Sequence, residues 1–341
     1  MEGAPGDAVT GVREVVRAGG LLAGERQMIV LLSGGRDSVC LLDVAVALRA
    51  PASVTALHLN YGLRDSAGAE QRHCEHLCEL LGAELSAASP EHSPPGGGEP
   101  GNLQAWAREE RYAAAFALAR KLDAAGGVPV ASGHTASDQV ETILYRLAAS
   151  PGRRALLGMA PRDRTRLGQP LIRPLLGVTR EQTTAYCAQR GLRWCDDESN
   201  LDPEYARARV RRDLVPALRA VHPAAEANVV RTAALLREEA AVLEELVAAQ
   251  LQGADSVAIE QLQALPPALA RLLVVRLAEQ AVGRFVPQAG GRVEELLALA
   301  RRGGRAELHL GGGAGAVIEE GRLRIVELPP RQARRGERRA N

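Results

Sequence analysis

The motif SGGRDS at residues 33–38 constrains the fold of this chain more than any other part of its sequence. It follows an unbroken apolar run at 28–32, typical of a buried parallel strand, and it precedes an apolar run at 39–48, typical of a helix. A glycine-rich turn between a strand and a helix suits anions, because the free N–H groups and the positive end of the helix dipole face the turn. The residues expected to bind nucleotide phosphates are Ser33, Gly34, Gly35, Arg36, Asp37 and Ser38.

Two common nucleotide-binding modes are excluded. The only lysine, Lys121, lies far from any glycine loop, so the motif is not a P-loop, which requires a lysine. The GxGxxG spacing of a dinucleotide site is also missing. An ordinary helix start capped by Asp37 or Ser38 is the alternative to a phosphate site. A carboxylate beside phosphates is repelled unless it caps the helix or holds a bridging cation, so we expect Asp37 to bind Mg²⁺.

Alternating strands and helices predict an α/β fold with a doubly wound, mostly parallel sheet. Strands are expected at 28–32, 53–60, 84–89 and 128–132, and helices at 12–22, 39–48, 66–81, 102–125 and 179–190. Ligands bind at the carboxyl ends of the strands in such a sheet. His58 and Asn60 lie at one of these ends, although a polar residue such as His58 is also common there without a function.

The segment GHTASDQVET at residues 133–142 follows the fourth predicted strand. Thr135 and Asp138 have the form of a capping box, which would explain both residues as a well-capped helix start. Asp138 and Glu141 are three residues apart and share a helix face at the ligand edge of the sheet, where two carboxylates could hold a cation. The sequence leaves both interpretations open.

The second half of the chain changes in composition. Residues 151–181 contain seven arginines against two acids, which suits either contact with a phosphate backbone or a solvated loop. Helical patterns dominate residues 217–300, and residues 305–326 read as a small antiparallel hairpin unit. We expect a nucleotide-binding domain at 1–205, a basic linker helix at 206–216, a mainly helical domain ending in a small β unit at 217–328, and a disordered tail at 329–341.

The composition of the whole chain limits its partners and its compartment. A formal net charge of +1 gives no electrostatic argument for a polyanionic partner, so only local clusters count. Residues 1–27 lack a continuous apolar core, and no run reaches the roughly 20 apolar residues of a membrane span. The sequence predicts a cytoplasmic enzyme without membrane contact. It leaves the oligomeric state open, a homodimer included.

These features resemble the N-type ATP pyrophosphatase, or PP-loop, superfamily, and within it the tRNA(Ile)-lysidine synthase family. The SGGRDS motif before a helix carries the first resemblance. Two departures stand out, because Tyr61 is found where the family usually has His and Ala208 where it usually has Asn. The segments that carry the second resemblance, in the family's order, are 58–64, 102–112, 133–142, 173–176 and 197–211.

The resemblance implies an ATP-dependent ligase. Such an enzyme adenylates the C2 oxygen of the wobble cytidine in a CAU-anticodon isoleucine tRNA and joins free L-lysine to C2. The products are lysidine, AMP and pyrophosphate, and codon reading changes from AUG to AUA. ATP would be the co-substrate, with Mg²⁺ beside it, and the helical domain would bind the tRNA body.

The resemblance also implies roles for individual residues. Asp37, Asp138, Glu141 and Arg111 would be catalytic, and Asp138 and Glu141 would bind the lysine ammonium. Arg111 and Arg207 would contact phosphates or the lysine carboxylate. The residues expected to bind ATP besides those at 33–38 are His58, Asn60 and Arg207.

Two alternatives stay open. A tRNA 2-thiocytidine-type sulfurtransferase has the same PP-loop fold, but such enzymes typically carry CxxC pairs, and this chain has none. A tRNA-binding module with a decayed loop would have no catalysis. The residues that argue against such decay are Ser33, Asp37, Asp138 and Glu141.

Overall fold

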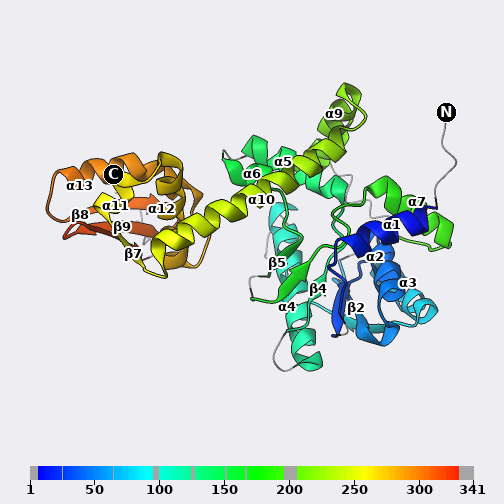
Figure 1. Cartoon of the computed structure of the whole chain (residues 1–341). Coiled ribbons are helices and arrows are strands. Elements are labelled where there is room, and N and C mark those ends of the chain that lie inside the picture. Colours follow the sequence, from blue (N-terminus) through cyan, green and yellow to red (C-terminus); the bar gives the residue numbers. More distant parts are fainter. Residues whose placement is uncertain are drawn as a thin grey trace, which may run out of the picture. The chain divides into compact units, whose positions relative to one another are not determined.

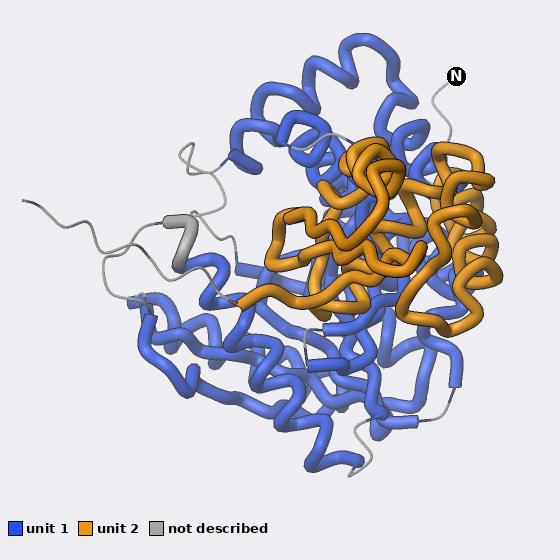
Figure 2. Tube along the Cα trace, turned by 90° about the vertical axis from the view of Figure 1, so that its left-hand side faces the viewer, with its two compact units in different colours: residues 1–235 blue, residues 236–341 orange. Residues whose placement is uncertain are grey.

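A computed structural model describes most of the chain. The described residues are 7–24, 26–63, 65–94, 100–123, 127–149, 152–165, 167–195 and 206–329. The centre of the predicted loop at 93–101, much of the segment at 197–211 and nearly all of the predicted tail lie outside them. The chain divides into two compact units, residues 1–235 and 236–341 (Figure 2). Among the helices of the described residues, none combines the length and apolar character needed to cross a bilayer.

The first unit contains a six-stranded sheet in the order β3-β2-β1-β4-β6-β5 (Figure 1). β5 pairs antiparallel with β6, and every other pairing is parallel. The strands are β1 (Met28–Leu31), β2 (Val54–Leu59), β3 (Glu84–Ala88), β4 (Val130–Ala131), β5 (Arg162–Arg164) and β6 (Pro170–Ile172). The predicted α/β fold with a mostly parallel sheet is therefore confirmed.

Alternate side chains of β1 pack against two different helical layers. Met28 and Val30 are buried in one core cluster, and Ile29 and Leu31 are buried in another. The first cluster includes side chains of α1 (Ala8–Ala18), α2 (Arg36–Leu48), α3 (Ala67–Leu81) and α7 (Arg180–Arg190), and the second includes side chains of α4 (Pro100–Leu122). Helices thus cover both faces of the sheet (Figure 1), which explains why β1 is apolar at every position.

The arginine-rich stretch at 151–181 is not simply a loop. It contains the short helix α6 (Arg153–Leu156) and the strands β5 and β6, which extend the sheet beyond β4. Leu171 and Ile172 are buried in the core. The sequence pattern missed β6 because this strand has only three residues and starts with Pro170, so its stability comes from tertiary packing and not from a long apolar run.

The first unit continues through a run of helices. Besides α5 (Ala136–Ala149), its helices after α7 are α8 (Ala206–Arg209), a π-helical turn (Val210–Leu214), α9 (Val215–Val221) and the start of α10 (Ala225–Leu251). Pro216 lacks the N–H that an α-helix would direct at a carbonyl one turn earlier, which explains the wider turn before it. The two units divide between Leu235 and Leu236, inside α10. The domain boundaries expected from the sequence stay a prediction.

The second unit combines helices with a four-stranded antiparallel sheet in the order β7-β10-β9-β8. The expected hairpin unit is present, and β7 adds a fourth strand to it. Leu323 and Ile325 of β10 pack into one core with side chains of α12 such as Leu273 and Leu277. The elements are β7 (Ser256–Ala258), α11 (Ile259–Ala264), α12 (Pro267–Val282), a 3-10 turn (Pro287–Arg292), α13 (Val293–Arg301), β8 (Ala306–Gly311), β9 (Ala314–Glu319) and β10 (Arg322–Glu327).

Candidate active site

The loop after β1 holds itself together with its own serines. The Ser38 hydroxyl donates to the Gly35 carbonyl at 2.7 Å and accepts from the Ser33 N–H at 3.2 Å. The Ser33 hydroxyl accepts from the Gly35 N–H at 3.3 Å. The residue that caps α2 is Gly35, without a side-chain cap, so the alternative of a helix start capped by Asp37 or Ser38 is wrong. An uncapped helix start after a glycine loop suits an anion.

Two glycines bring other segments against this loop. Gly34 has a φ of +82°, which favours glycine, and its carbonyl accepts from the Cys195 N–H at 2.9 Å. A Cβ on Gly133 would lie 3.1 Å from the backbone carbon and oxygen of Asp37. Gly133 therefore lets the segment that leads into α5 lie directly against the start of α2.

Three acidic side chains from these segments surround Arg180, the first residue of α7. Arg180 Nη2 lies 2.9 Å from Asp138 Oδ1, and Arg180 Nη1 lies 3.0 Å from Glu141 Oε1. Arg180 Nε lies 4.0 Å from Asp37 Oδ2. The carboxylates expected to bind Mg²⁺ and the lysine ammonium thus lie around one guanidinium. We refer to Asp37, Asp138, Glu141, Arg180 and Arg211 as the acidic cluster.

Arg211 of the π-helical turn completes the acidic cluster. Its Nε lies 2.7 Å from Glu141 Oε1 and its Nη2 lies 3.0 Å from Glu141 Oε2, which is a two-pronged ion pair. The Glu141 side chain is only 5% exposed, whereas Asp138 is 22% and Asp37 is 23% exposed. Both oxygens of Glu141 are therefore engaged below the surface, and the two aspartates form the open part of the cluster.

The capping box expected at the start of α5 is present as well. Asp138 Oδ2 accepts from the N–H of Thr135 at 2.8 Å and from its hydroxyl at 2.9 Å. The Asp138 N–H in turn donates to the Thr135 hydroxyl at 3.3 Å. The two interpretations of this segment are compatible, because one oxygen of Asp138 serves the cap and the other faces Arg180.

Burial alone would lower the pKa of Arg180, but the carboxylates of Asp138 and Glu141 more than offset this effect and raise it. The guanidinium is therefore permanently charged. Asp37 Oδ1 has two further partners, since the Thr183 hydroxyl, one turn along α7, donates to it, and Arg36 Nε lies 3.4 Å from it.

Several arginines lie near His134, a residue of the same segment as Asp138 of the acidic cluster. Burial, with Arg173, Arg108 and Arg111, lowers the pKa of His134 to about 4 against the opposing effect of Asp138, so the imidazole is neutral at pH 7. Its Nδ1 lies 2.9 Å from the Ser132 hydroxyl. After burial, Arg207, Arg173 and Arg108 also lower the pKa of Arg146, which links Arg146 and Arg207 to the others. We refer to Arg108, Arg111, Arg146, Arg173 and Arg207 as the arginine group.

The arginine group includes two residues that the sequence assigned to the site. Arg111 Nε donates to the Tyr61 hydroxyl at 3.2 Å, and that hydroxyl donates to the Ala107 carbonyl at 2.8 Å. Tyr61 thus positions Arg111 with a hydroxyl. Arg207 is exposed on α8, and burial followed by the Arg207 charge lowers the pKa of Arg146. Neither Arg111 nor Arg207 has a described contact with the acidic cluster.

His58 and Asn60 lie at the carboxyl end of β2, where their side chains form hydrogen bonds. The buried His58 ring places Nδ1 3.0 Å from the carbonyl of Leu32, the residue before the loop. Asn60 Nδ2 donates to Gln71 at 2.9 Å, and Asn60 Oδ1 accepts from the Gly62 N–H at 3.0 Å. Both side chains brace strand ends, and their assignment to the nucleotide site stays a prediction.

Sequence reasoning gave no individual site role to Arg211, Thr183 or His134, and it counted Arg180 only among the seven arginines at 151–181 that could contact phosphates. One signal for Arg180 was available. Thr179 and Gln182 form a capping box that begins α7, so Arg180 occupies the first turn, where a cation opposes the helix dipole. An arginine in that position indicates nearby acids.

The residues around the loop suit an Mg²⁺ ion only if substrate oxygens complete its coordination. Among the described residues, no three His, Cys, Asp or Glu side chains are grouped in a way that could hold a metal. Asp37 offers one oxygen, Oδ2, that faces only Arg180 Nε at 4.0 Å among its described partners. A single carboxylate beside phosphates is the usual protein share of an Mg²⁺ site.

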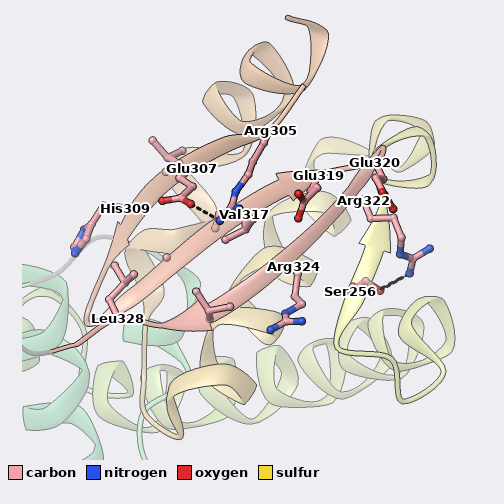
Figure 3. Close-up of a pocket in the computed structure, with 14 residues that line it drawn as sticks. Ser256, Arg305, Glu307, His309, Val317, Glu319, Glu320, Arg322, Arg324 and Leu328 are labelled. Carbon is pink, nitrogen blue, oxygen red and sulfur yellow. Dashed lines mark hydrogen bonds and ion pairs between the residues drawn. The ribbon is translucent and has the colours of Figure 1, made fainter. Parts of the chain in front are cut away.

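The second unit has a separate hollow on its antiparallel sheet (Figure 3). It has a volume of about 680 Å³. Both basic and acidic side chains line it, and Arg305 Nη2 pairs with Glu307 Oε1 at 2.9 Å. Its charged lining residues are Arg305, Glu307, Glu319, Glu320, Arg322 and Arg324, and His309 lies among them.

Comparison with known proteins places this site in a family. The model of the PP-loop domain matches residues 10–218. A tRNA(Ile)-lysidine synthase from Chromobacterium violaceum is 38% identical over 223 residues, which are 64% of this chain and 49% of that protein. The chain thus spans about half the length of this relative.

Other relatives match over nearly their whole length. The tRNA(Ile)-lysidine synthase from Salinispora tropica is 35% identical and covers 88% of this chain and 90% of its own. The tRNA(Ile)-lysidine synthase from Salinispora arenicola is 34% identical, and the match covers 93% of this chain and 96% of that protein. Among solved structures, a U34-tRNA thiolase from Methanococcus maripaludis matches with a TM-score of 0.54 at 16% identity, covering 67% of this chain and 80% of that chain, which shows a shared fold. The chain therefore belongs to the tRNA(Ile)-lysidine synthase family of PP-loop proteins.

Proposed function

We propose that this protein is an ATP-dependent ligase that adenylates C2 of the wobble cytidine of CAU-anticodon isoleucine tRNA and joins free L-lysine to it. One observation carries the proposal. Asp37 from the glycine loop and Asp138 and Glu141 from α5 gather at the carboxyl edge of a parallel sheet, in a member of this family. Products would be lysidine, AMP and pyrophosphate.

The glycine loop supplies the ATP half of the reaction. The uncapped start of α2 directs its dipole at the loop, where the pyrophosphate would leave. Mg²⁺, held by Asp37 and the phosphates, would neutralise the charge that develops there. The cytidine oxygen attacks the α-phosphorus, and the bond between the α- and β-phosphates breaks. C2 of cytidine, a urea-like carbon, then carries a good leaving group.

The acidic cluster supplies the lysine half. The ε-amine of lysine, after losing a proton, attacks C2 and AMP leaves, so no protein nucleophile is needed. Substrate lysine arrives as a cation, and Asp138 is the partly exposed carboxylate on α5 that it can reach. Holding the amine beside C2 replaces an encounter in solution by an intramolecular approach.

The arginine group suits the tRNA and the lysine carboxylate. Arg111 is oriented by Tyr61, and Arg207 is exposed. Three guanidiniums act on the neutral His134 imidazole, and Arg207 acts on Arg146, so the positive charge of the group favours anions such as phosphates. The tRNA body would contact the second unit, where the hollow of Figure 3 carries Arg305, Arg322 and Arg324.

The test is lysine transfer. The protein is incubated with ATP, Mg²⁺, radiolabelled lysine and an isoleucine tRNA transcript with a CAU anticodon. We expect labelled tRNA and one AMP per lysine joined. A matched transcript with UAU in place of CAU should accept none, because it lacks the wobble cytidine. Folded protein that transfers no lysine to the CAU transcript would refute the proposal, and sulfur incorporation at C2 would favour the sulfurtransferase instead.

A further inference from the structure

We propose that Arg180 is a positioning residue for substrate lysine, which gathers the three carboxylates into one site and sets the charge of that site. The inference rests on the proposed function and assigns a role within its lysine half. Each nitrogen of the Arg180 guanidinium faces a different acid, with Nη2 at 2.9 Å from Asp138, Nη1 at 3.0 Å from Glu141 and Nε at 4.0 Å from Asp37.

The rigid fork of arginine explains this geometry. A planar guanidinium presents its donors at fixed angles, so three acids that bind it are held at fixed positions relative to one another. Asp37 comes from α2, whereas Asp138 and Glu141 come from α5. Arg180 on α7 is therefore the side chain that ties the loop carboxylate to the pair on α5.

The local structure disfavours an arginine here unless it has such a role. Arg180 is the first residue of α7, where its charge opposes the helix dipole. Its backbone N–H donates to the Ser137 hydroxyl at 3.2 Å, which fixes the start of α7 beside the start of α5. The side chain is 22% exposed, so it gives up much of its hydration to reach the acids.

The ion pairs of the acidic cluster indicate which of its carboxylates a ligand can reach. Arg36 Nε lies 3.4 Å from Asp37 Oδ1, so with Arg180 and Arg211 three guanidiniums balance the three carboxylates. Arg211 and Arg180 together occupy both oxygens of Glu141. Asp138 is therefore the partly exposed carboxylate of α5, at 22%. Because Asp37 is assigned to Mg²⁺, lysine is expected to place its ammonium against Asp138, with Glu141 as the anchor for the arginines.

The experiment compares Arg180→Ala, Arg180→Lys and a matched control, Arg190→Ala, in the lysine-transfer assay. Arg190 also lies on α7 and also pairs with an acid, Asp43, outside the site. We expect Arg180→Ala to raise the KM for lysine about tenfold to a hundredfold while the KM for ATP changes less than about threefold. Arg180→Lys keeps the positive charge but lacks the planar guanidinium, so its KM for lysine should lie between those of the wild type and Arg180→Ala.

A double-mutant cycle tests whether Arg180 acts through Asp138. Arg180→Ala and Asp138→Asn together should cost less than the product of their separate effects on the KM for lysine. Independent effects would overturn the inference, as would an unchanged or lowered lysine KM in Arg180→Ala. If Arg180→Ala fails to fold, Arg180→Gln and Arg180→Lys replace it under the same criteria.

The outcomes separate the two proposals. A wild-type protein without lysine transfer refutes the proposed function, whatever the variants do. A wild-type protein with normal transfer, combined with Arg180 variants that change lysine and ATP KM equally or behave like Arg190→Ala, refutes only the role of Arg180.

Discussion

Two groups of arginines and acids join α2 to α7, and they differ in exposure and in charge. The acidic cluster lies at the start of both helices. A second group, the Asp43 cluster, consists of Asp43, Arg13, Tyr186 and Arg190. Asp43 is 2% exposed, and Arg190 Nη2 and Nε lie 2.8 and 3.0 Å from its two oxygens. Arg13 lies 3.3 Å from Asp43, and the Tyr186 hydroxyl also donates to it.

The difference in exposure and charge distinguishes a structural ion-pair cluster from a binding site. The Asp43 cluster has one acid for two arginines, so no negative charge is left for a ligand. Burial would raise the pKa of Asp43, but Arg190 and Tyr186 outweigh it and hold that pKa below its usual range. In the acidic cluster, by contrast, Asp37 and Asp138 are partly exposed and within reach of a ligand. Similar residues on the same helices thus serve different purposes.

Removing Asp37 should produce the largest effect on activity. Asp37→Ala deletes the carboxylate beside the phosphates, and we expect AMP release to fall about 10²–10³-fold. Thermal stability should change little, because Asp37 is 23% exposed. AMP release is measured with saturating lysine and tRNA. Near-normal release would show that Asp37 has no part in the ATP half.

Removing Asp43 should lower stability and leave substrate binding unchanged. Asp43→Ala leaves Arg13 and Arg190 without their buried counter-ion, and the free energy of unfolding should fall by about 3–5 kcal/mol. Below the melting temperature, the lysine KM should be unchanged. Urea unfolding and lysine kinetics check both points. A selective rise in lysine KM would remove the distinction between the two clusters.

Neutralising Asp138 should separate lysine from ATP. Asp138→Asn keeps the shape and one acceptor for the Thr135 cap but removes the charge that faces Arg180. We expect the lysine KM to rise about 10–100-fold, equivalent to roughly 1.4–2.7 kcal/mol. ATP binding should be retained. Equal losses for both substrates would contradict a lysine site at Asp138.

Adding a methyl group at Gly133 should displace the backbone of Asp37 and so disturb the acidic cluster. The added Cβ would lie 3.1 Å from the Asp37 backbone, so α2 and the start of α5 must separate slightly. We expect Gly133→Ala to cost about 1–3 kcal/mol of stability and to lower lysine transfer. Gly11→Ala is a suitable control, since its Cβ would meet nothing within 4 Å. Equal behaviour of the two variants would show that the close approach is unimportant.

The smallest effect is expected from His134, whose protonation makes the stability of the protein depend on pH. Its pKa is about 4 in the folded protein, whereas the ordinary value is about 6.5. The unfolded chain therefore takes up a proton first, so this contribution to stability is complete above about pH 6.5 and is lost as the pH falls towards 4. His134→Gln should reduce the stability difference between pH 7.5 and 4.5, measured by urea unfolding at both pH values. An unchanged difference would mean that the ring is not held neutral.

The sequence predicted the sheet better than the site. Apolar runs such as 28–32 are buried on both faces, and a run of this kind signals a parallel strand without knowledge of its neighbours. The three-residue strand at Pro170–Ile172 has no such signal, because its partner β4 decides its conformation. The motifs located Asp37, Asp138 and Glu141, but not the arginines between them. Contacts such as Arg180 to Asp37 link segments far apart in the chain, and an arginine-rich stretch gives no indication of which member turns inward.

The most direct test of the central claim is the lysine-transfer assay with two variants in parallel, Asp138→Asn from the acidic cluster and Asp43→Asn from the Asp43 cluster. The initial rate of lysine transfer to CAU-anticodon isoleucine tRNA is measured against lysine concentration at a temperature where all three proteins are folded. We predict transfer by the wild type, a lysine KM raised about 10–100-fold only in Asp138→Asn, and a wild-type KM in Asp43→Asn. No transfer by folded wild-type protein, or the same lysine KM in both variants, would contradict the account.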